Sequence, residues 1–106
     1  MNYEEEARKL KSSGVICSNA LFNVFKDDLN LTGNPPAPRS IDGMCGAYLT
    51  AKYILKEIGK EEYIDDYNKM FTEKFKSNKC LELMKKDRRC VDYVGESAKF
   101  INNLIK

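Results

Sequence analysis

Apolar residues recur at helical spacing along almost the whole chain, and this pattern constrains the fold more than any other feature. Such stripes occupy residues 3–12, 15–29, 43–58, 61–76 and 88–105. Apolar positions three and four residues apart are what an amphipathic helix buries. No stretch shows the sustained alternation of apolar and polar residues that a half-buried strand needs. We therefore expect an all-α fold: a compact bundle of about five helices with no sheet.

The helical pattern is interrupted by one long loop, which we place at residues 30–42. Its three prolines, Pro35, Pro36 and Pro38, cannot lie inside a helix. The chain has 106 residues, the size of one ordinary domain. We expect residues 1–106 to form a single helical domain, and the role of the loop stays open.

The charge balance and the chain's first residues limit the kind of partner. The net charge is only +2, from 18 basic and 16 acidic residues, which does not predict nucleic-acid binding. No apolar run approaches the length of a membrane helix, so we expect no membrane insertion. The first residues are acidic and do not resemble a secretory signal, so we expect a cytoplasmic protein.

The missing residue types exclude several chemistries. The chain has no histidine, which excludes Ser-His-Asp and Cys-His catalysis and any mixed cysteine–histidine zinc site. Neither of the common glycine-rich nucleotide fingerprints is present. Any chemistry must therefore use other groups, and cysteine is the strongest candidate.

The chain has four cysteines, and all four are candidate site residues: Cys17, Cys45, Cys80 and Cys90. No two of them form a CxxC pair, which argues against a zinc ribbon, a thioredoxin-type motif and the common ferredoxin patterns. Free cysteine is also among the most buried residue types, so a packing role is the alternative.

Each cysteine follows a residue that favours the start of a helix. The predicted N-caps are Ser13, Asp42, Ser77 and Asp87, which lie three or four residues before the cysteines. Unpaired N–H groups and the positive end of the helix dipole stabilise a thiolate there. We predict that the four thiols lie at helix starts, where they could converge at one end of the bundle.

The residues around Cys45 resemble a known motif. Residues 42–47 (DGMCGA) are similar to the CGA motif of the C_GCAxxG_C_C family, and the cysteine order of that family holds from residue 17 to about residue 100. The chain departs from the motif at its final glycine, because that position is occupied here by Thr50. The resemblance implies a mostly helical domain, a redox role resting on the four cysteines, and an association with transporters.

Three functions remain open from the sequence. The first is thiol–disulfide exchange or electron transfer, in which Cys45 attacks, a nearby cysteine resolves, and Arg39, Arg88 or Arg89 lowers the thiol pKa. This would make the protein a thiol–disulfide oxidoreductase with an unknown redox partner. Four cysteines allow three complete pairings, and the sequence does not choose among them.

The second function is a metal site, in which all four cysteines hold zinc or an iron–sulfur cluster. The third is a helical interaction module with structural cysteines, which binds a transporter-associated protein or a second copy of itself. Only the second function needs a cofactor.

Overall fold

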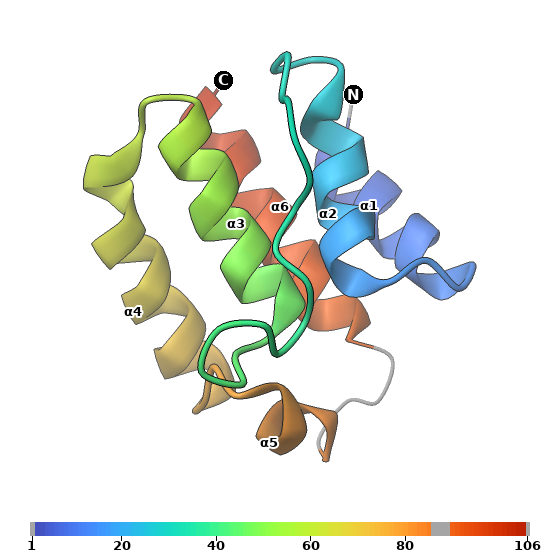
Figure 1. Ribbon diagram of the computed structural model, residues 1–106, viewed down its shortest axis with the longest axis vertical. Helices are drawn as coiled ribbons and strands as arrows, with labels where there is room; N and C mark the ends of the chain where they lie inside the picture. Colours follow the sequence, from blue (N-terminus) through green and yellow to red (C-terminus); the bar gives the residue numbers. More distant parts are fainter. Residues whose placement is uncertain (1, 86–89, 106) are drawn as a thin grey trace.

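The computed structural model describes residues 2–85 and 90–105, which form six α-helices and one short 3-10 helix (Figure 1). The elements in order are α1 (Tyr3–Ser12), α2 (Cys17–Lys26), α3 (Gly46–Glu57), η1 (Glu61–Tyr63), α4 (Ile64–Phe75), α5 (Cys80–Met84) and α6 (Val91–Ile105). The described part of the chain contains no strand, so the predicted all-α bundle is confirmed.

Two helices are shorter than predicted, and the loop between them is correspondingly longer. Helix α2 ends at Lys26, and residues 27–30 form a turn in which Asn30 adopts a left-handed φ of 53°. Helix α3 begins at Gly46 rather than at Gly43, which has a φ of 70°. Left-handed residues end helical geometry, so the loop spans residues 27–45. The predicted start of the last helix at residue 88 lies outside the described residues.

The helices α2, α3 and α6 run side by side and begin at the same end of the molecule (Figure 1). The long loop carries the chain back along the bundle from the end of α2 to that starting end. Helix α5 lies beneath the same end, and α6 also packs against α1. Three helix N-termini are therefore gathered at one end of the bundle.

An aromatic cluster joins α3, α4 and α6. Tyr67 and Phe71 are fully buried and lie against Tyr48, while Phe75 meets Tyr93 edge to face with ring centroids 4.7 Å apart. Such pairs add to the stabilisation that comes from burial alone. The cluster is part of the hydrophobic core that holds these three helices together.

Buried hydroxyls fix α5 and α4 against α6. The Ser97 hydroxyl donates to the Tyr93 carbonyl at 2.7 Å, so it accepts the bond from the Tyr67 hydroxyl, also at 2.7 Å. The Tyr93 hydroxyl donates to the Leu83 carbonyl at 2.8 Å. This last bond holds the helix that begins with Cys80.

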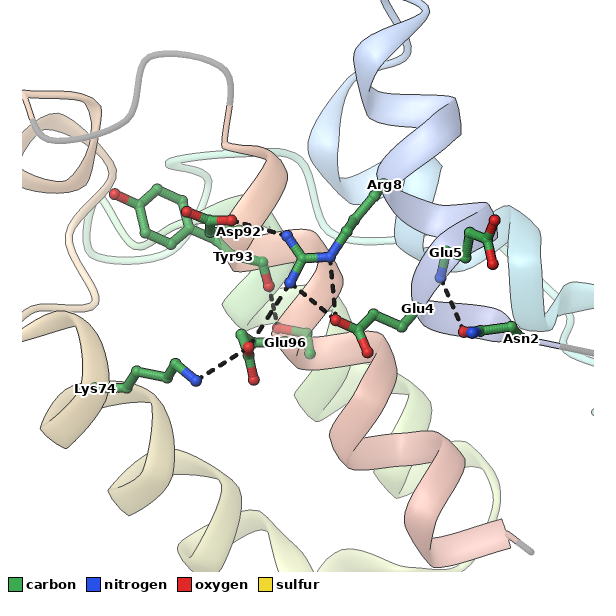
Figure 2. Close-up of polar contacts among 9 residues, drawn as sticks. Asn2, Glu4, Glu5, Arg8, Lys74, Asp92, Tyr93 and Glu96 are labelled. Carbon is green, nitrogen blue, oxygen red and sulfur yellow. Dashed lines mark hydrogen bonds and ion pairs between the residues drawn. The ribbon is translucent and has the colours of Figure 1, made fainter.

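An ion-pair network ties α1 to α6 (Figure 2). The Arg8 guanidinium binds the carboxylates of Glu4 at 3.0 Å and Asp92 at 2.8 Å, and Lys74 reaches Glu96 at 3.0 Å. Gly95 makes room for this network, because a Cβ there would lie 2.2 Å from the Arg8 Nε. The glycine inside the last helix is therefore a close-approach position.

Candidate functional site: a thiol cluster at the helix starts

All four cysteines lie at the start of a helix and are buried, as thiols, within the described residues. Cys17 is the first residue of α2, Cys45 is the N-cap of α3, Cys80 is the first residue of α5, and Cys90 directly precedes α6. The predicted placement of the cysteines is therefore confirmed.

The predicted capping residues are wrong where the structure describes them. The N-caps of α2, α3 and α5 are Ile16, Cys45 and Lys79, and none makes a side-chain capping hydrogen bond. Ser13 instead ends α1, where its hydroxyl donates to the Leu10 carbonyl. Asp87 lies outside the described residues. The cysteines thus lie nearer to the helix ends than predicted, at the cap or the first helical residue.

A single antiparallel bridge joins the segments that lead to Cys45 and Cys80. Met44 pairs with Lys79 across this bridge. The Cys45 N–H donates to the Asn78 carbonyl at 2.8 Å, and the Cys80 N–H donates to the Gly43 carbonyl at 2.9 Å. The bridge fixes two cysteines that are far apart in sequence at neighbouring positions.

Cys17 lies at the centre of the cluster. Its sulfur accepts hydrogen bonds from the thiols of Cys45 and Cys90 and from the backbone N–H of Ala47 in the first turn of α3. These donors, with a smaller contribution from Lys11, lower the pKa of Cys17 well below its ordinary value, although burial opposes them. The arrangement favours a thiolate at Cys17.

The pKa values of the two donor thiols, Cys45 and Cys90, shift in the opposite direction. The pKa values of Cys45 and Cys90 are raised, chiefly because each holds its proton in the hydrogen bond to Cys17, and burial adds to the effect. The expectation that Cys45 has the lowered pKa is therefore wrong, because its thiol donates to a neighbour that the sequence did not place. The three sulfurs share one negative charge, which the hydrogen bonds centre on Cys17.

Cys90 reaches the cluster in an unusual backbone conformation. Its φ is 59°, in the left-handed region that non-glycine residues seldom adopt. Such conformations cost free energy and concentrate at functional sites. The residue lies directly before α6, and its carbonyl accepts a hydrogen bond from the Val94 N–H at 3.1 Å.

Cys80 lies at the edge of the cluster. Burial raises its pKa, the charge of Cys17 adds to that effect, and Arg39 opposes both. Three arginines were expected to lower a thiol pKa. Arg39 lowers the pKa of Cys80 rather than that of Cys45. Arg88 and Arg89 lie outside the described residues. Lys11 was not predicted, and its position in α1 carries no sequence signal for this role.

Gly46, the glycine of the CGA segment, permits the close contact between α2 and α3. A Cβ at this residue would lie 2.7 Å from the Cys17 Sγ and 2.8 Å from the Cγ of Pro38. The proline-rich loop therefore covers the helix start next to the thiol. One turn further along α3, Thr50 is fully buried, and its hydroxyl lacks a hydrogen-bond partner among the described residues.

In the described ranges 2–85 and 90–105, no group of three or more cysteine or acidic residues is arranged to hold a metal ion. No helix within those ranges is long and apolar enough to cross a bilayer. Comparison with models of protein families, with curated proteins and with solved structures found no match.

Proposed function

We propose that this protein carries out thiol–disulfide exchange through the cluster of Cys17, Cys45 and Cys90. One observation carries the proposal: Cys17 accepts hydrogen bonds from two other thiols and has a lowered pKa. Attack on a disulfide requires a thiolate and a second thiol within reach of the mixed disulfide. Both requirements are met by side chains from three different helix starts.

The exchange proceeds in two steps. The Cys17 thiolate attacks one sulfur of a substrate disulfide, and the other substrate sulfur leaves as a thiolate that takes up a proton. The Cys45 or Cys90 thiol then loses its proton and attacks the Cys17 sulfur, which forms an internal disulfide and releases the second substrate thiol. Two electrons pass from the protein to the substrate disulfide, and a second dithiol returns them in the reverse direction.

The proposal also bears on the cellular compartment and on the family resemblance. A role in exchange fits a reducing compartment such as the cytoplasm, where these thiols would not be held as structural disulfides. It also fits the redox role that the resemblance to the C_GCAxxG_C_C family implies. Cys80 is outside the hydrogen bonds that Cys17 accepts, so we assign it no step in the first exchange.

The test is a map of thiol reactivity and pairing in the reduced protein. Brief alkylation at mildly acidic pH should modify Cys17 first, because its lowered pKa keeps it ionised there. Oxidation by excess hydroxyethyl disulfide should then remove two thiols per chain, reversibly. Peptide mapping should identify a bond from Cys17 to Cys45 or to Cys90.

Two variants sharpen this experiment. Cys17→Ser should abolish the internal disulfide, whereas Cys80→Ser, the matched control, should leave both the early alkylation and the pairing intact. A reduced protein that forms no internal disulfide, or in which Cys17 is the least reactive thiol, would contradict the proposal. Metal content is measured on the same anaerobic sample, because one metal ion or cluster per chain would support the metal-site function instead.

A further inference from the structure

Exposed large apolar side chains gather near the cysteines. In the part of the chain that the structure describes, three such residues are exposed: Ile16 at 54%, Ile41 at 51% and Leu81 at 61%. Ile16 directly precedes Cys17, Leu81 directly follows Cys80, and Ile41 lies in the turn that leads to Cys45. Among the described residues, the exposed large apolar side chains therefore lie close to the cysteines in the sequence.

These three residues belong to one end of the molecule. The bridge between Met44 and Lys79 places the turn containing Ile41 beside the segment containing Leu81. Ile16 joins them because the Cys17 sulfur that follows it contacts Cys45. We call Ile16, Ile41 and Leu81 the apolar rim.

A groove continues from the rim along α3. Its volume is about 360 Å³, and its lining includes Ile41, Met44 and Leu49 together with Lys52 and Lys56. Met44 is the residue before Cys45, so the groove ends next to the thiol cluster. Its size suits one or two side chains of a bound polypeptide.

The charge around the rim is mainly positive. The charge of Lys11 lowers the pKa values of Cys17 and Cys90, and the charge of Arg39 lowers that of Cys80, so both cations lie near the thiols. Lys79 is exposed at the bridge. The described carboxylates at this end are Asp42, which lines the groove, Glu82, which accepts a hydrogen bond from the Ser77 hydroxyl, and Asp92, which is paired with Arg8. Lys52 and Lys56 of the groove bring the described basic side chains here to five against these three carboxylates, and this excess favours an acidic partner.

We propose that the cysteine end docks a partner polypeptide whose reactive disulfide is flanked by apolar and acidic residues. This inference rests on the proposed thiol–disulfide exchange and specifies its substrate class. The apolar rim and the groove contact the partner's apolar side chains, and the basic residues attract its carboxylates. Large apolar side chains exposed beside a reactive site are typical of an interaction surface.

The test compares three disulfides as oxidants of the reduced protein. Two are homodimers of pentapeptides that carry leucine on both sides of the cysteine, one with acidic and the other with basic end residues. The third is neutral hydroxyethyl disulfide. Each oxidant is used in excess, Cys17 loss is followed by alkylation, and every rate is divided by the rate of the same disulfide with dithiothreitol, which removes differences in intrinsic reactivity.

We expect the acidic peptide to react at least about tenfold faster than the basic peptide at low salt, since complementary charge raises encounter rates. The advantage should shrink at high salt. The triple variant Ile16→Ser, Ile41→Ser and Leu81→Ser should lower the ratio of acidic-peptide rate to hydroxyethyl-disulfide rate by a similar factor. Ile105→Ser, at the opposite end of α6, should leave this ratio within about twofold.

The outcomes separate this inference from the proposed function. If hydroxyethyl disulfide oxidises the protein but the acidic peptide has no advantage, or the triple variant keeps the wild-type ratio, the docking inference is wrong and thiol exchange stands. If no disulfide reacts, both are wrong. Sedimentation velocity tests whether the protein associates with itself, and a vesicle assay tests whether it binds anionic lipid. If either interaction occurs and is lost in the triple variant, the rim binds another occupant and the inference is overturned.

Discussion

Replacing Gly46 by alanine should disturb the thiol cluster through a single added methyl group. Gly46 is the first residue of α3 and has an ordinary helical position, so the backbone accepts alanine without φ strain. The new Cβ would lie 2.7 Å from the Cys17 Sγ and 2.8 Å from the Pro38 Cγ. Ordinary contacts begin at 3.4 Å, so the sulfur or the methyl group must move by about 0.7 Å, the difference between 3.4 and 2.7.

The magnitude follows from two opposing effects. An extra methyl group in a packed site costs about 1–3 kcal/mol, because the neighbours must shift or leave their preferred rotamers. Alanine recovers at most about 1 kcal/mol of helix propensity relative to glycine. Pro38 is a rigid ring with its Cα only 3.3 Å from the added atom, so it gives way poorly. We expect a net loss of about 1–2 kcal/mol in the free energy of unfolding.

The thiol chemistry should change in the same variant. A displaced Cys17 sulfur loses part of the hydrogen bond from the Ala47 N–H, so the pKa of Cys17 should rise toward its ordinary value. Urea unfolding measures the stability, and the pH dependence of alkylation at Cys17 measures the pKa. Both are recorded on the reduced protein.

Gly95→Ala is the matched control for this experiment. It also adds a methyl group against a close neighbour, but that neighbour is the flexible end of Arg8, at the ion-pair network rather than at the thiols (Figure 2). It should alter the stability without changing the alkylation profile of Cys17. If Gly46→Ala leaves both the stability and the profile unchanged, or if Gly95→Ala changes the profile equally, our reading of Gly46 as the contact that positions Cys17 is refuted.

Three further predictions concern buried polar groups. Thr50→Val should stabilise the protein by about 1 kcal/mol, because it removes a buried hydroxyl without a partner among the described residues. Thr72→Val, the control, should destabilise the protein, because the Thr72 hydroxyl donates to the Asn68 carbonyl. Urea unfolding compares the two variants. Ser97→Ala should cost about 1–3 kcal/mol on the same assay by leaving the buried Tyr67 hydroxyl without its acceptor, and an unchanged midpoint would contradict this. Because the pKa of Cys17 is lowered, the folded state binds fewer protons than the unfolded state. The stabilisation that the Cys17 thiolate gives the fold should therefore be complete above the ordinary thiol pKa and fade as the pH falls. The difference in unfolding free energy between wild type and Cys17→Ser should narrow from pH 8 to pH 5, and a constant difference would count against a folded-state thiolate.

The fold was largely predictable because its signals are local. The apolar stripe of residues 3–12 matches α1 in both of its ends, and the stripes of the later helices place their centres correctly. The helix ends depended on backbone geometry that the apolar pattern does not encode. Lys76, at the end of α4, adopts a φ of 66°, and Asn30 adopts 53° after α2. Neither conformation has a strong sequence signal at these positions.

The candidate site was predictable in its members but not in its roles. All four cysteines were expected near helix starts and lie there, although Ser13, Asp42 and Ser77, the residues on which that expectation rested, do not cap these helices. Which sulfur accepts and which donates depends on how three helix starts meet in space. The pKa of Cys17 is lowered because both Cys45 and Cys90 hydrogen-bond to its sulfur. Sequence spacing of many residues cannot reveal such a contact, so the sequence favoured Cys45 rather than Cys17 as the thiol with the lowered pKa.

The contacts that lower the pKa of Cys17 also bear on the direction of the proposed exchange. Hydrogen bonds from Cys45, Cys90 and the Ala47 N–H stabilise the reduced, charged state of the cluster. An internal disulfide at Cys17 destroys all of these interactions with the thiolate, so the reduced form gains free energy that the oxidised form lacks. A stabilised reduced form makes a disulfide more oxidising. We therefore expect the internal disulfide to be easily reduced, so a second dithiol should readily return the oxidised protein to its dithiol form in the proposed cycle.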